Sequence, residues 1–91
     1  MSIRITERHM QPGGSGHEHI ARLKWVRNDA AKSGENSRAE IIKWIEQEKG
    51  EAYVSSGGRT VSVRVVHATP PYLRTWADGV WTDNLLALPE Y

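Results

Sequence analysis

The chain has 91 residues and a mass of 10.3 kDa, a size typical of one small domain, residues 1–91, and too small for a two-domain enzyme. It contains no cysteine, which excludes disulfides, thiolate nucleophiles and cysteine zinc sites and leads us to expect a cytoplasmic protein. Twelve basic and eleven acidic residues give a net charge of +1, so nucleic acid is not a favoured partner. No apolar stretch predicts a membrane span or a signal peptide. Because so short a chain buries a small core, we expect a homo-oligomer.

Two strands and a glycine-rich loop are predicted in the N-terminal part. Ile3 and Ile5 alternate with polar residues and the pattern fades towards His9, which is typical of a strand with one buried face. Three glycines within residues 11–16 predict a loop. The alternation in residues 19–26 then predicts a second strand, antiparallel to the first.

One helix is predicted in the middle of the chain. Residues 27–36 are polar and are expected to form a connection. The helix begins after them, because Ser37 and Glu40 have the spacing of a capping box. Apolar residues recur at helical spacing until the cation and glycine at positions 49–50, which are expected to end a helix of about three turns.

The C-terminal half predicts four strands in two hairpins and a packed apolar tail, residues 83–89. A Thr-Pro-Pro sequence interrupts pairing between the hairpins, and Asp78-Gly79 is a strong turn signal in the second hairpin. The predicted order is β-β-α-β-β-β-β, an α+β fold of the small two-layer sandwich type, with one helix on one face of an antiparallel sheet. The four C-terminal strands are predicted over residues 52–54, 60–67, 72–76 and 80–82.

Two segments carry a resemblance to a known family. Residues 13–20 read GGSGHEHI and residues 72–89 read YLRTWADGVWTDNLLALP. With Trp25 and residues 52–54, they resemble a family of short bacterial and phage proteins known only as a domain of unknown function. The resemblance covers nearly the whole chain and brings no catalytic residues with it. It implies a small stand-alone domain in a phage or bacterial setting. Because small phage proteins without an enzymatic signature often counter host defence, this setting suggests by analogy a phage counter-defence protein.

The glycine-rich loop and the histidines after it form the first candidate site. Successive backbone amides of Gly13, Gly14, Ser15 and Gly16 can converge on an anion, or the segment can be a simple flexible connection. If the strand has already begun, His17 and His19 lie on one face. The pair then suits a metal with a third ligand, a ligand contact or a polar strand end.

Aromatic residues form the second candidate site. The chain has four tryptophans, three tyrosines and no phenylalanine, a bias typical of binding sites and subunit interfaces. Tyr72, Arg74 and Trp76 fall on one face of a predicted strand, where they can stack a base and hold a phosphate or simply pack across strands. Trp81 can join them, and Asn84 can bind a ribose or base edge or hold a turn. Trp25 and Trp44 are predicted to belong to the core.

No catalytic constellation stands out, so we predict a non-enzymatic module with no cofactor and no bound metal. It is expected to bind, and sequester, a nucleotide-like anionic small molecule as a homo-oligomer. The alternatives are a protein or nucleic-acid adaptor that uses the aromatic and arginine sheet face, and a metal-dependent hydrolase built on His17 and His19. The predicted ligand-binding residues are Gly13, Gly14, Ser15, Gly16, His17, His19, Tyr72, Arg74, Trp76, Trp81 and Asn84.

Overall fold

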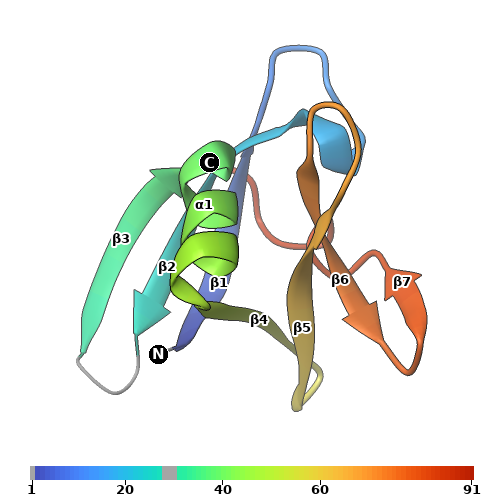
Figure 1. Ribbon diagram of the computed structural model, residues 1–91. Coiled ribbons are helices and arrows are strands. Elements are labelled where there is room, and N and C mark those ends of the chain that lie inside the picture. The colour runs from blue at the N-terminus through green and yellow to red at the C-terminus, as the bar shows by residue number, and fades with distance from the viewer. Residues whose placement is uncertain (1, 28–30) are drawn as a thin grey trace.

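The computed structural model describes residues 2–27 and 31–91 (Figure 1). Over these residues the chain forms seven strands, one α-helix and one short 3-10 helix. The fold class is therefore α+β, and most of the structure is sheet. In chain order these are β1 (Ser2–Met10), η1 (His17–His19), β2 (Ile20–Arg27), β3 (Lys32–Ser37), α1 (Arg38–Glu48), β4 (Glu51–Ser56), β5 (Arg59–Val66), β6 (Tyr72–Ala77) and β7 (Val80–Thr82).

The strands form a single sheet in the order β3-β2-β1-β4-β5-β6-β7. All neighbours are antiparallel except β1 and β4, which pair in parallel with Ile3 opposite Ala52. The prediction of a fully antiparallel sheet is therefore wrong at this pair. The reason is that α1 returns the chain from β3 at the edge to the centre of the sheet, and a crossover through a helix brings the next strand back in its original direction.

Strand β3 corrects the predicted order of elements. Residues 27–36 are predicted to be a polar connection, and residues 28–30 of it lie outside the described residues, but Lys32–Ser37 pairs along β2. The strand lacks an alternating apolar pattern because it is an edge strand in which no residue is buried. Gly34 lies opposite Trp25, and a Cβ at Gly34 would be 2.5 Å from the Trp25 ring. The Trp25 indole Nε1 donates to Asn36 Oδ1 at 2.8 Å.

The helix begins as predicted. The Ser37 hydroxyl accepts from Glu40 N at 3.2 Å, and a Glu40 carboxylate oxygen accepts from Ser37 N at 2.9 Å, which completes a capping box. At the other end it is Lys49, with φ 55°, and not Gly50, that adopts the left-handed conformation. Gly50 is needed for a different reason, since a Cβ there would be 2.3 Å from the Trp44 ring.

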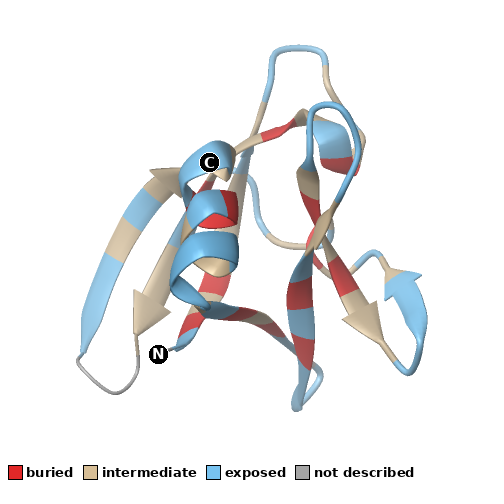
Figure 2. Cartoon of the chain, in the orientation of Figure 1, coloured by how far each residue is buried: buried red, intermediate tan, exposed pale blue. Residues whose placement is uncertain are grey.

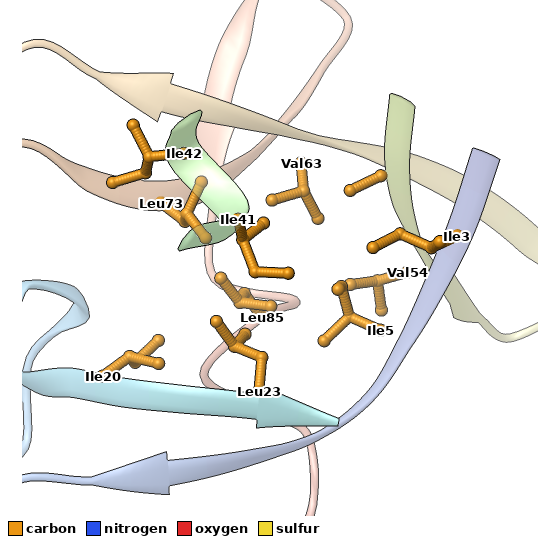
Figure 3. Packing of buried hydrophobic residues seen from close by; sticks show 11 residues of the cluster. Ile3, Ile5, Ile20, Leu23, Ile41, Ile42, Val54, Val63, Leu73 and Leu85 are labelled. Carbon is orange, nitrogen blue, oxygen red and sulfur yellow. The ribbon is translucent and has the colours of Figure 1, made fainter. Parts of the chain in front are cut away.

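The core lies between α1 and one face of the curved sheet (Figures 2 and 3). Trp25 and Trp44 pack against this core as predicted. The tail is also packed as predicted, because the Leu85 side chain is fully buried in the core. Beyond Leu85 the tail runs beside the second half of β1, where Arg8 N donates to Pro89 O and Tyr91 N donates to Arg8 O, each at 3.0 Å. It therefore occupies the edge of β1 that β4, paired only with residues 2–4, leaves open.

Candidate functional site

The β6–β7 hairpin presents a pair of tryptophans. The Asp78-Gly79 turn has φ 52° and 82°, the positive angles expected of a tight hairpin turn, and it places Trp76 directly opposite Trp81. The two rings are edge to face, with centroids 4.8 Å apart and an interplanar angle of 82°. Trp81 is 38% exposed and Val80 59% exposed, and both lie on β7, the edge strand.

An arginine completes this aromatic surface. The guanidinium carbon of Arg64 lies 5.3 Å from the centroid of the Trp76 ring, within range of a cation–π contact. Within the described part of the chain, no carboxylate pairs with Arg64. The positive charge therefore remains available beside the two indoles.

These residues line an open groove of about 1010 Å³, which we call the tryptophan groove. Its other end is acidic, because Glu46 lies there with one carboxylate oxygen 2.7 Å from His67 Nε2. The groove is therefore positive beside the indoles and negative at the end of α1. Its lining includes Tyr53, Thr60, Ser62, Arg64, Trp76 and Trp81.

Arg74 does not join the tryptophan groove, although it shares a strand face with Trp76. Its side chain turns to the edge of β6, where Nε donates to Thr82 O at 3.2 Å and Nη2 donates to Asp83 Oδ1 at 2.9 Å. Arg64, its cross-strand neighbour, takes the place over Trp76. Tyr72 is half-buried at the start of β6, opposite Val66. Arg64 is not among the predicted site residues, because its position over Trp76 depends on the strand register, which no local pattern reveals.

His17 joins Arg74 instead of the groove. It lies in η1, which packs beside β6 (Figure 1), and only 7% of the residue is exposed. Its Nε2 is buried, has no hydrogen-bond partner among the described residues, and lies 3.7 Å from Asp83 Oδ1. Burial lowers the pKa of His17 below its ordinary value and the Arg74 charge lowers it further, whereas Asp83 acts in the opposite direction. Burial and the Arg74 charge therefore both favour the neutral form of His17.

Two backbone amides of the glycine-rich loop converge on one point, but the group that accepts from them is the His19 side chain and not an anion. The backbone N–H groups of Ser15 and Gly16 donate to His19 Nδ1 at 3.2 and 3.1 Å. Gly13 has a φ of 75°, and a Cβ at Gly14 would be 2.4 Å from His19 Cβ, so the glycines allow the loop to fold against the histidine.

The strand predicted to begin at His19 in fact starts at Ile20. The prediction that His17 and His19 share one face of that strand is therefore wrong. A 3-10 turn separates the two imidazoles, since successive residues of such a helix are rotated by about 120° and not alternated as in a strand. His17 faces Asp83 and His19 faces the loop amides. Over the described ranges, 2–27 and 31–91, no three metal-binding side chains form a group.

Asn84 lies at the turn that follows β7. Its backbone N donates to Thr75 Oγ1 at 3.1 Å, and Thr75 itself is fully buried. Thr75 Oγ1 also donates to Thr82 O at 2.9 Å and accepts from Thr82 Oγ1 at 2.7 Å. Asn84 also lines a second hollow of about 560 Å³ together with Arg59 and Trp76. The Thr75 hydroxyl thus holds the chain that carries Asp83 towards Arg74.

The fold and the groove define a small α+β sheet protein with an aromatic surface groove. The chain belongs to the family DUF3892, described as a protein of unknown function, which matches residues 4–89. This match confirms the resemblance seen in the sequence. Comparison with curated proteins found no match, and comparison with solved structures found none. Over the described residues no helix has the length and apolar character needed to cross a membrane.

Proposed function

We propose that this protein is a non-enzymatic module that binds a nucleotide-like anionic small molecule in the tryptophan groove. The observation that carries the proposal is the Arg64 guanidinium over the Trp76 ring, beside the partly exposed Trp81. An exposed indole offers a face on which a base can stack. An arginine held against an aromatic ring presents a positive charge and several N–H donors to a phosphate.

The charges of the groove suggest how such a ligand would lie. The phosphate would bind at Arg64, because the opposite end carries the Glu46 carboxylate. The hydroxyls of Thr60 and Ser62 line the groove between β4 and β6 and offer hydrogen bonds to a sugar. The volume is at the upper end of the roughly 300–1,000 Å³ range of small-molecule sites. Sequestering such a ligand would suit a phage counter-defence protein, the setting that the resemblance implies.

The proposal includes self-association through β7. This strand ends the sheet, so its outer edge has no neighbouring strand within the described residues, and Val80 on it is exposed. Pairing with β7 of a second copy would cover Val80 and place two tryptophan grooves near one interface. The same edge could instead accept a strand of another protein, the adaptor alternative. Light scattering of the purified protein distinguishes a monomer from a homo-oligomer. Val80→Lys is the variant that should disrupt self-association through β7.

Thermal unfolding against a ligand panel tests the proposal. A ligand that binds only the folded state raises the midpoint by mass action. We expect a shift with one class among mononucleotides, cyclic dinucleotides and ADP-ribose derivatives, and its loss in Arg64→Ala and Trp81→Ala. Lys32→Ala is the matched control, because it also removes one exposed cation but lies on β3, at the opposite edge of the sheet from β7, and does not line the groove.

Two results would contradict the groove assignment. One is a ligand whose affinity is the same in Arg64→Ala, Trp81→Ala and wild-type protein. The other is the absence of any shift in a protein that melts cooperatively, which would favour the adaptor alternative. Binding of oligonucleotides that weakens steeply with salt would indicate a nucleic-acid adaptor.

A further inference from the structure

The glycine-rich loop folds against the imidazole of His19, and His17 is buried in the same 3-10 turn. We propose that residues 13–19 form a proton-sensitive loop, which is closed when His17 and His19 are neutral and opens when they are protonated. This inference goes beyond the proposed function and does not depend on it, since residues 13–19 do not line the tryptophan groove.

His19 holds the loop through its unprotonated ring nitrogen. Nδ1 accepts from two backbone N–H groups, those of Ser15 and Gly16. An imidazole can accept at Nδ1 only when it is neutral and carries its proton on Nε2. A second proton would place an N–H at Nδ1, directed at two other N–H groups, and both hydrogen bonds would be lost. Imidazoles ordinarily take up this proton within the range pH 5–8.

The carboxylate of Glu18 lies next to the same nitrogen and would stabilise the protonated form of His19. Glu18 Oε1 lies 3.7 Å from His19 Nδ1, too far for a hydrogen bond but close enough to attract an imidazolium. In the closed loop Glu18 also packs against Gly16, where a Cβ would be 2.5 Å from Glu18 Oε1. The neutral ring therefore has two loop amides as partners, and the charged ring has a carboxylate.

His17 adds to the effect from the other side of the turn. Its buried Nε2 has Asp83 Oδ1 as a nearby acceptor, and that oxygen already accepts from Arg74. Protonation would thus place a buried cation next to a guanidinium that competes for the same oxygen. The lowered pKa of His17 agrees with this cost. Movement of η1 towards solvent would relieve it.

Charged groups from every element around the turn take part in this balance. Arg74 and Arg8 oppose protonation of His17, whereas Asp83 and Glu18 favour it. From α1, Arg38 Nη1 donates to the backbone oxygen of Glu18 and ties the turn to the helix. Opening of the loop would break this tie and uncover the part of β6 that η1 contacts.

Amide exchange of the loop measures the opening directly. We expect the protection of the Ser15 and Gly16 amides, corrected for the intrinsic pH dependence of exchange, to fall about tenfold or more between pH 7.5 and 5.5. Magnetisation transfer from water in the folded, full-length protein gives these rates. His19→Asn keeps an acceptor oxygen close to the position of Nδ1 and cannot be protonated, so its loop should stay protected at both pH values. His67→Asn, at an exposed histidine that pairs with Glu46 and makes no hydrogen bond to the loop, is the control and should respond to pH like the wild type.

Equal protection of the wild-type loop at pH 7.5 and 5.5 would overturn the proposal, as would a pH response of His19→Asn equal to that of the wild type. If His19→Asn does not fold, ¹⁵N shifts of the wild-type imidazoles still decide the matter. The proposal requires the His19 proton on Nε2 at pH 7.5, and a proton on Nδ1 would refute it.

Discussion

The hydroxyl of Thr75 offers a sharp test of how the tail is attached to the sheet. Thr75 is fully buried, and its Oγ1 accepts from Asn84 N and Thr82 Oγ1 and donates to Thr82 O. Thr75→Val keeps the shape of the side chain but leaves these two donors without their acceptor. A buried donor without a partner costs about 1–3 kcal/mol, so we expect the variant to lose about 2–4 kcal/mol of unfolding free energy.

Thr75→Ser is the matched control, because it keeps the hydroxyl and removes one buried methyl group at a cost of about 1 kcal/mol. Urea unfolding of the two variants and the wild type measures the difference. For a domain of this size, each kcal/mol corresponds to a fall in Tm of about 4–8 °C. A Thr75→Val variant as stable as Thr75→Ser would show that the hydroxyl does not hold the turn after β7, and the reasoning on Asp83 and Asn84 would fail with it.

Two further predictions concern His17 and Leu85. The folded-state pKa of His17 is lowered, so the unfolded chain binds more protons, and stability should fall as the pH drops below the ordinary value of 6.5, until the folded-state pKa is passed. Urea unfolding at pH 7.5, 6.5 and 5.5 checks this, and His17→Gln should flatten the slope; an unchanged slope would exclude His17 as its source. Leu85→Ala should lower the unfolding free energy by about 3–5 kcal/mol, because the removed side chain leaves a cavity in the core. A loss below about 1 kcal/mol in chemical denaturation would mean that the tail does not pack on its own core.

Signals that act within a few residues were sufficient to predict several parts of this fold. The capping box starts the helix at Ser37 and Glu40, which are one turn apart. The Asp78-Gly79 turn needs only two residues that tolerate positive φ. The pairing of Trp76 with Trp81 around that turn depends on the same short range.

The candidate site depended far more on tertiary structure. His17 and Asp83 are 66 positions apart in the printed sequence, yet they lie 3.7 Å from each other. Which arginine lies over Trp76 depends on the register of β5 against β6, where Arg64 and Arg74 are direct neighbours. His19 can accept from the loop amides only because residues 17–19 form a 3-10 turn, which the alternating pattern of the sequence does not reveal.

The amino-acid sequence by itself therefore determined the family, the α+β class, the helix, the hairpins and the glycine-rich and aromatic segments. The tertiary structure alone decided the edge strand β3, the parallel pairing of β1 with β4, and the division of the predicted site residues between the tryptophan groove and the histidine loop. The physical reason is the range of the interactions. Caps and tight turns are satisfied by atoms a few residues away, whereas a polar edge strand and a buried imidazole acquire their partners only when the sheet assembles.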